Sequence, residues 1–176
     1  MGEQKYSSAC TSINSYKVPA LAKIIASKYA NTCWDVLDYG GGKYETTTKF
    51  LETVHIKNHI YDPYNRTPEE NQEAMSRDNY ILVMLSNVLN VIAEQEVRLQ
   101  ILKEIRDHMC SLGSLYIKIY EGNRSGVIKI NEKRNSCQLN KKTEEYLDEI
   151  FQVFDFVRLE RICGVTVIIA EKERWC

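Results

Sequence analysis

The feature that most constrains the fold is a short apolar run, residues 36–39, that ends in three consecutive glycines at 40–42. Residues 34–39 predict a strand, and residues 46–54, beyond the glycines, predict a helix. Because glycine has no side chain, the backbone amides of such a turn can approach a ligand closely, next to the start of the following helix. A strand, a glycine turn and a helix in this order predict an α/β protein with a ligand site at the carboxyl end of that strand.

The rest of the chain repeats this alternation. Residues 80–86 are typical of a buried strand, and residues 94–110 carry apolar side chains at helical spacing before a connection that ends at Gly113. Interleaved strands and helices predict one mostly parallel sheet with helices on both faces, and the last two strands can pair antiparallel at one edge. Residues 121–142 are polar and irregular. Further helices are expected at residues 18–29, 69–77 and 143–151, and further strands at 59–62, 114–120, 154–159 and 165–171.

Length and composition limit the class of protein. The chain has 176 residues and a formal net charge of −1, which fits one domain over residues 1–176, with residues 1–30 as an N-terminal arm and helix. This charge gives no global attraction to nucleic acid. No apolar stretch approaches the roughly 18 residues of a membrane span, so we expect a soluble cytoplasmic protein without membrane contact. The six cysteines and three histidines lack metal-ligand spacing, so we expect reduced thiols and no metal site.

A second acid lies where the next predicted strand ends. Asp62 follows Asp38, the last acid before the glycines, by 24 residues. In nucleotide-binding α/β folds an acid at this place accepts two hydrogen bonds from ribose hydroxyls. We therefore expect Asp62 to bind the ribose of a cofactor that contains a nucleoside.

These residues resemble the motifs of the class I S-adenosylmethionine-dependent methyltransferases. The first motif of that family, an acid-x-Gly-x-Gly loop, is matched by Asp38, Gly40 and Gly42. Asp62 matches the ribose acid of the family, and the order of predicted elements agrees over about residues 36–172. The resemblance implies a Rossmann-like methyltransferase sheet and S-adenosylmethionine as the cofactor.

The resemblance also implies roles for individual residues. In that family the glycine loop wraps the methionine portion of the cofactor, which assigns Gly40 and Gly42 to backbone contacts. Asp38 would orient the loop and the amino group of the cofactor. The run Ser-Asn-Val-Leu-Asn at 86–90 is similar to the fourth motif of the family, so Asn87 would lie beside the sulfonium.

Two departures from the family pattern concern the adenine side. Only 18 residues separate Asp62 from Ile81, too few for the strand and helix that the family usually places there. The sheet is therefore predicted to be one strand short, without the third strand, and the acid that contacts adenine has no counterpart. Tyr64, in the turn at residues 63–65, is expected to contact the adenine instead.

Two other interpretations of the glycine turn stay open. Gly40-x-Gly42 also opens the fingerprint of nicotinamide dinucleotide sites, but that motif asks for glycine or alanine where this chain has Glu45. A turn of this kind can also be purely structural, in an α/β protein that binds no ligand. The mismatch at Glu45 and the acid at position 38 favour S-adenosylmethionine.

Residues that follow the later strands are candidates for catalysis. Methyl transfer from a sulfonium is an in-line displacement, so the protein positions both reactants and supplies a base where one is needed. We expect Asn87, Glu121 and Arg124 to position the reactants or to supply the base. In the alternative interpretation, Asn87 caps a turn, and Glu121 and Arg124 form a solvated pair. Residues 121–142 would shape the choice of acceptor. Other candidates near the acceptor are Tyr16, Lys17, Asn90 and Tyr120.

The sequence thus predicts an S-adenosylmethionine-dependent methyltransferase. Its acceptor can be a small molecule, a protein or a nucleic acid, and its oligomeric state is left open. Residues 61–66 and 120–126 look more loosely like small methyltransferase-like proteins of phages and mobile elements, which implies an unassigned substrate. The alternative is a noncatalytic module on the same fold that binds S-adenosylmethionine or a partner.

Overall fold

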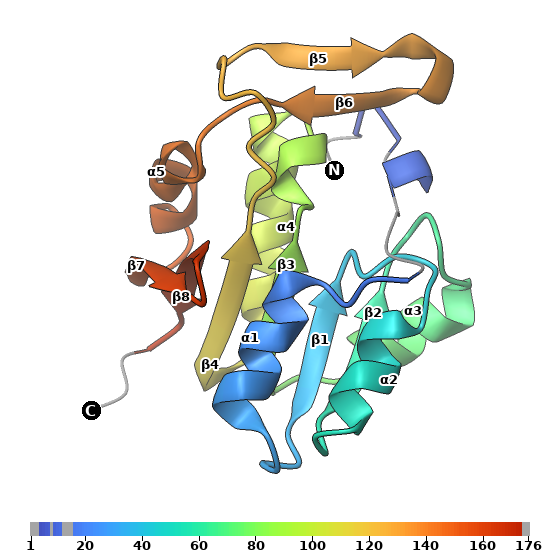
Figure 1. The fold of residues 1–176 in the computed structure, drawn as a ribbon, viewed down its shortest axis with the longest axis vertical. Coiled ribbons are helices and arrows are strands. Elements are labelled where there is room, and N and C mark those ends of the chain that lie inside the picture. The colour runs from blue at the N-terminus through green and yellow to red at the C-terminus, as the bar shows by residue number, and fades with distance from the viewer. Residues whose placement is uncertain (1–3, 8, 12–15, 174–176) are drawn as a thin grey trace.

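A six-stranded sheet is the centre of the computed structural model, which describes residues 4–7, 9–11 and 16–173. The strand order is β2-β1-β3-β4-β8-β7, parallel from β2 to β4 and antiparallel at β8 and β7 (Figure 1). This confirms the mostly parallel α/β sheet with an antiparallel edge. The strands are β1 (Asp35–Tyr39), β2 (Lys57–Tyr61), β3 (Tyr80–Ser86), β4 (Met109–Lys118), β7 (Phe156–Ile162) and β8 (Val165–Glu171).

The sheet is one strand short on the β2 side, as predicted. From β2 the chain passes through a single helix, α3 (Pro68–Met75), and enters β3, which pairs with the other side of β1. A capping box between Thr67 and Glu70, with Pro68 at the first helical position, fixes where α3 begins. This short path leaves β2 as the edge strand of the sheet.

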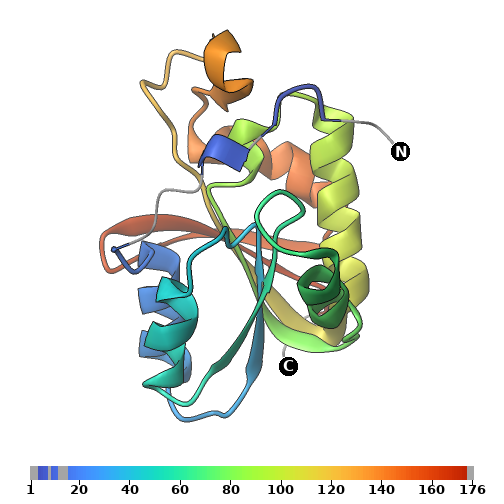
Figure 2. The same cartoon turned by 90° about the vertical axis from the view of Figure 1, so that its right-hand side faces the viewer.

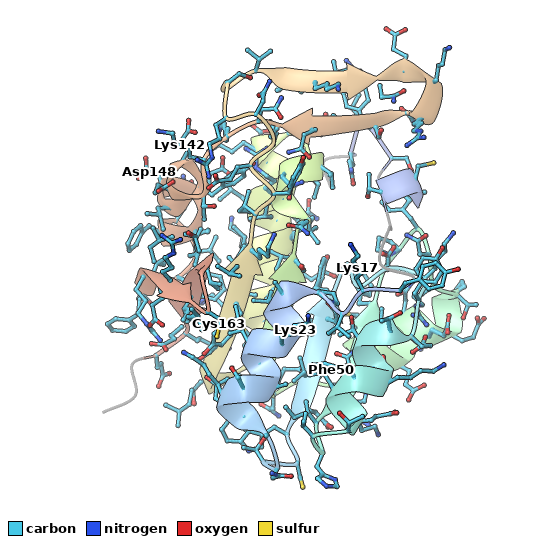
Figure 3. The ribbon with its side chains drawn as sticks, viewed as in Figure 1. Lys17, Lys23, Phe50, Lys142, Asp148 and Cys163 are labelled. Atoms are coloured by element: carbon cyan, nitrogen blue, oxygen red, sulfur yellow. The ribbon has the colours of Figure 1, made fainter. Side chains whose placement is uncertain are left out.

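Helices cover both faces of the sheet (Figure 2). On one face, α1 (Ala20–Tyr29) and α2 (Thr46–Glu52) lie side by side, and Figure 3 labels Lys23 and Phe50 on them. On the other face, α3, α4 (Gln95–His108) and α5 (Leu147–Phe151) pack on a separate apolar cluster. None of the described helices is long and apolar enough to cross a membrane.

Residues 121–142 contain a β-hairpin that the sequence did not reveal. Strands β5 (Ile128–Asn131) and β6 (Ser136–Leu139) pair antiparallel as a separate two-stranded sheet above the main one (Figure 1). Asn135, with φ 45°, closes the turn after the short helix η3 (Glu132–Arg134). All four residues of β5 are exposed, so the strand lacks the alternation of buried and exposed residues by which strands are recognised.

The start of β4 also differs from the prediction. The strand begins at Met109, directly after α4, so Gly113 lies inside the strand rather than in a connection. A Cβ atom at Gly113 would lie 2.9 Å from the carbonyl oxygen of Tyr80, where the pairing of β3 and β4 is irregular. The glycine therefore marks a close approach of two strands.

A buried ion pair fixes the segment between β3 and α4. Arg98 donates hydrogen bonds to both carboxylate oxygens of Glu149, at 2.7 and 2.6 Å, and so joins α4 to α5. The same guanidinium donates to the carbonyl oxygens of Ile92 (2.7 Å) and Ala93 (2.9 Å). These contacts hold the chain that follows the short helix η2 (Leu89–Val91), beside the end of β3.

Candidate active site

A cavity of about 440 Å³ lies at the carboxyl ends of β1, β2 and β3. Parallel α/β sheets place ligands at this edge. The β5–β6 hairpin and the N-terminal arm (residues 4–7 and 9–11) complete the walls, and both lie over this end of the sheet in Figure 1. The three strand ends contribute Tyr39, Gly40, Gly41, Gly42, Asp62, Pro63, Tyr64, Asn65, Ser86, Asn87 and Val88.

The glycine turn is built without room for side chains. Gly40 and Gly42 have φ angles of 77° and 79°, in the left-handed region that favours glycine. A Cβ atom at Gly40 would lie 2.5 Å from Cγ2 of Val88, and one at Gly41 would lie 2.7 Å from Oδ2 of Asp38. The turn therefore exposes backbone to the cavity.

Asp62 lines the cavity and joins the glycine turn to the turn after β2 through hydrogen bonds. Its Oδ2 accepts a hydrogen bond from the backbone amide of Gly42 at 3.0 Å. Its Oδ1 accepts from the backbone amides of Tyr64 (2.9 Å) and Asn65 (3.0 Å) and from the Asn65 side chain (3.1 Å). An ionised carboxylate has about four acceptor positions, two on each oxygen, so Oδ2 is the atom with capacity left for a ligand hydroxyl.

Asp38 lies beneath the glycine turn and does not line the cavity. The pKa of this carboxyl is raised from 3.8 to about 7, mainly by burial and also by the negative charge of Asp62, while the Arg66 guanidinium opposes the shift. Asp38 is therefore near the midpoint of its titration at neutral pH. A positive ligand charge close to it would favour the ionised form.

Arg66 is a structural contributor to the site that the sequence interpretation missed. Its Nε donates to the carbonyl oxygen of Gly42 at 2.8 Å, and its guanidinium pairs with Glu45 and with Glu70. Glu45, which departs from the dinucleotide fingerprint, thus binds the arginine that holds the glycine turn. The sequence feature that could have indicated Arg66 is its position just before the first turn of α3, four residues after Asp62.

Tyr64 connects the turn after β2 to the N-terminal arm. Its ring is 42% exposed at the cavity, and its hydroxyl donates to Oε1 of Gln4 at 3.1 Å. Gln4 in turn donates to the carbonyl oxygen of Val91 at 3.4 Å. The arm therefore spans between two walls of the cavity.

Asn87 follows β3 in a left-handed conformation, with φ 60°. Its backbone amide donates to the carbonyl oxygen of Lys118 at 2.8 Å, and its Oδ1 accepts from Nζ of Lys118 at 3.2 Å. Because lysine can only donate, the amide oxygen of Asn87 is fixed toward Lys118. Lys118, at the end of β4, was not predicted as a site residue, and burial lowers its pKa.

Comparison with known proteins identifies the fold that carries this site. No protein-family model matches the sequence, and no curated protein sequence matches it. Among solved structures, it is similar to 1,6-didemethyltoxoflavin-N1-methyltransferase of Burkholderia thailandensis, with a TM-score of 0.65, 14% identity, and coverage of 95% of this chain and 84% of that one. The chain has the fold of the S-adenosylmethionine-dependent methyltransferases.

Other structures with the methyltransferase fold agree. A TehB-like methyltransferase of Corynebacterium glutamicum has a TM-score of 0.57 and 15% identity, and 89% of each chain is covered. Human N-acetylserotonin methyltransferase, solved with S-adenosylmethionine, also has a TM-score of 0.57, with 12% identity over 88% of this chain. The present chain spans about half the length of the human enzyme and of several other methyltransferases that it matches.

Two of the three residues predicted for catalysis lie outside the cavity lining. Glu121 accepts from the backbone amide and the hydroxyl of Thr143, at 2.8 and 2.6 Å, and pairs with the exposed Arg124. The hydroxyl of Thr143 is the main reason why the pKa of Glu121 is lowered. This geometry agrees with the alternative of a solvated pair, here one that caps the short helix η4 (Thr143–Tyr146).

The candidates near the acceptor separate into two groups. Asn90 and Tyr120 line the cavity, and Asn90 donates to Oε1 of Gln138 on β6 at 3.0 Å. Tyr16 and Lys17 are exposed and do not line it; Figure 3 shows Lys17 just ahead of α1.

The hairpin supplies lining residues that no sequence motif indicated. They include Lys129, Asn131, Arg134 and Gln138. Among the residues that the structure describes, no group of three or more histidine, cysteine, aspartate or glutamate side chains could hold a metal ion. The cavity is thus built from strand ends that the motifs predicted and a hairpin that only the structure revealed.

Proposed function

We propose that this protein binds S-adenosylmethionine in the cavity and transfers its methyl group to an acceptor. The observation that carries the proposal is the meeting of three strand ends: the glycine turn, Asp62 and Asn87 line one cavity in a methyltransferase fold. Three similar structures were solved with S-adenosylmethionine or S-adenosylhomocysteine.

The residues on the cofactor side fit such a ligand. Gly40, Gly41 and Gly42 line the cavity and carry no side chains, so the backbone of this turn is open to the methionine portion. Asp62 retains acceptor capacity on Oδ2 for a ribose hydroxyl. Tyr64 offers a half-exposed ring for the adenine.

The chemistry required of the chain is mainly positioning. S-adenosylmethionine supplies an electrophilic methyl group. The glycine turn and Asp62 would hold the cofactor, Asn87 would stand beside the reacting centre, and the hairpin and N-terminal arm would exclude water. Asp38, from below the turn, would favour a positively charged amino group when ionised.

Calorimetric titration with S-adenosylmethionine and, separately, with NAD tests the proposal. We expect binding of the former alone, weakened about tenfold or more by Asp62→Ala, since a charge-assisted hydrogen bond is lost. Asn71→Ala is the matched control, because the Asn71 side chain binds only backbone atoms, those of Asp62 and Arg66, and does not line the cavity. If S-adenosylmethionine does not bind, or if both variants weaken binding equally, the assignment fails.

A noncatalytic module that binds the same cofactor is the second candidate. One observation favours it: among the described residues, the only carboxylate lining the cavity is Asp62, which is already engaged, and no histidine lines it. Formation of S-adenosylhomocysteine with added acceptors separates the two candidates. Binding without any turnover would favour the module.

A further inference from the structure

The side of the cavity formed by the hairpin carries positive charge. Lys129 on β5 and Arg134 at the end of η3 both line the cavity. Neither side chain forms an ion pair or a hydrogen bond with any residue that the structure describes. Two cations without a partner among the described residues therefore face a space in which the only described carboxylate, Asp62, is held by four hydrogen-bond donors.

The side-chain amide of Asn87 is a neutral hydrogen-bond donor that also suits a negatively charged ligand. Since Oδ1 of Asn87 is occupied by Lys118, the amide nitrogen is left to interact with a ligand, and it forms no hydrogen bond with a described residue. A primary amide nitrogen can only donate. The cavity thus combines Asn87, Lys129 and Arg134, all of which complement a ligand with negatively charged oxygens.

Two other polar side chains in this region, Gln138 and Cys137, are used by the protein itself. Gln138 donates to the carbonyl oxygens of Tyr120 (2.9 Å) and Leu139 (2.7 Å) and accepts from Asn90. Cys137 is buried, and its thiol donates to the carbonyl oxygen of Val91 at 3.1 Å. Among the described residues, no histidine and no carboxylate other than Asp62 lines the cavity, so a nucleophile that needs no protein base fits this lining best.

We propose that the methyl acceptor is a small organic anion that attacks through its own charged oxygen, a carboxylate or a phenolate, and that Lys129 and Arg134 bind it. The proposal rests on the methyl transfer proposed above. A lone pair of the acceptor oxygen forms the new bond to the methyl carbon, the carbon–sulfur bond breaks with both electrons going to sulfur, and no proton is released. The negative charge of the acceptor oxygen and the positive charge of the sulfonium are both neutralised. The acceptor becomes an ester or an ether, and the sulfonium becomes a thioether.

The test measures binding of three small probes to the full chain loaded with S-adenosylhomocysteine. Benzoate represents a carboxylate, 4-nitrophenolate a phenolate, and benzamide is the neutral match of benzoate. We expect one of the anions to bind at least about tenfold more tightly than benzamide, as expected for a charge-assisted contact. The two anions distinguish the source of the charged oxygen.

Variants link the binding to the two cations. The double variant Lys129→Gln/Arg134→Gln should lose about tenfold or more of the anion affinity and leave the affinity for S-adenosylhomocysteine unchanged. Lys133→Gln is the matched control, because Lys133 lies in the same hairpin turn but does not line this cavity. Retention of anion binding in the double variant would overturn the proposal.

The remaining outcomes separate this proposal from the proposed function. If S-adenosylhomocysteine does not bind, the methyltransferase assignment fails first. If it binds but benzamide equals both anions, the anionic acceptor is wrong. The same holds if none of the probes binds at about 10 mM. If a short DNA duplex binds through the same two cations and displaces the anions, the site is a nucleic-acid surface and the proposal also falls.

Discussion

Asp38 and Asp62 end adjacent parallel strands but meet different environments. Asp62 accepts four hydrogen bonds, three of them from backbone amides, and so joins the turns that follow β1 and β2. Asp38 is buried below the glycine turn, beside the charge of Asp62, and its pKa rises to about 7. The Asp62 carboxylate therefore organises the turns of the site, whereas Asp38 changes charge near neutral pH.

The first prediction concerns the effect of Asp38 on stability. Its pKa is raised from 3.8 in the unfolded chain to about 7 in the folded one, so the folded state binds the proton more tightly. The stability from this group is full below about pH 4 and is lost as the pH rises to about 7. Asp38→Asn should therefore gain stability relative to the wild type between pH 5 and pH 8, on the order of 2 kcal/mol or more.

Urea unfolding at pH 5 and pH 8 measures this difference. The control is Asp155→Asn, an exposed position on which the two pH values should have little effect. An equal difference between Asp38→Asn and the wild type at both pH values would show that Asp38 is not protonated in the folded protein near neutral pH.

The second prediction concerns ligand binding by the same residue. If Asp38 orients the ammonium group of the cofactor, binding favours the ionised carboxylate and releases a proton near pH 7. The affinity of the wild type for S-adenosylhomocysteine should then rise from pH 6 to pH 8, and Asp38→Asn should lack this component. Calorimetry in buffers with different ionisation enthalpies counts the proton, and the same pH dependence in both proteins would contradict the role.

At the scale of elements, one buried ion pair joins α4 to α5, and one exposed ion pair joins α4 to the segment between α5 and β7. Arg98 and Glu149 are buried, and Arg98 also holds the chain after η2, next to cavity residues. Arg106 and Asp155 are 3.6 Å apart, and the Asp155 side chain is 71% exposed. A buried charge that loses its partner costs far more than an exposed one.

The third prediction follows from this contrast. Glu149→Gln should destabilise the protein by about 3 kcal/mol or more, because the Arg98 guanidinium stays buried without a counter-charge. Asp155→Asn, the matched control, should cost less than about 1 kcal/mol. Equilibrium urea unfolding gives both values, and similar values for the two variants would show that the inner pair is solvated.

At the scale of the whole molecule, one sheet separates two apolar clusters and carries the cavity at its end. The cluster around α1 and α2 and the cluster around α3, α4 and α5 both pack on the central strands. Sheet strands, hairpin and N-terminal arm all contribute to the lining. A ligand in the cavity therefore contacts parts of the chain that are far apart in sequence.

The fourth prediction is that the chain unfolds as one cooperative unit. Calorimetric scanning should show a single transition, because both apolar clusters share the same sheet. S-adenosylhomocysteine at about 100 times its dissociation constant should stabilise the folded state by roughly 3 kcal/mol and shift the whole transition. Two transitions, of which only one responds to the ligand, would contradict a single domain over residues 1–176.

The sequence by itself determined the order of the elements in the main sheet and the glycine turn at one end of the cavity. Strand β3 and strand β8 were predicted with the bounds that the structure has, since both are runs of apolar and β-branched residues. Gly40 and Gly42 signalled the turn because backbone geometry that excludes a side chain leaves a direct mark on sequence. The short spacing after Asp62 likewise limited the number of strands.

Only the tertiary structure decided what lies opposite that turn. Glu121 and Arg124 are charged residues after a strand, as catalytic residues often are, but their contacts to Thr143 and to each other place them outside the cavity lining. Lys129 and Arg134 had no motif, and a hairpin with an exposed strand brings them to the cavity. Local patterns encode elements and turns, whereas the meeting of side chains across a cavity depends on packing between segments far apart in sequence.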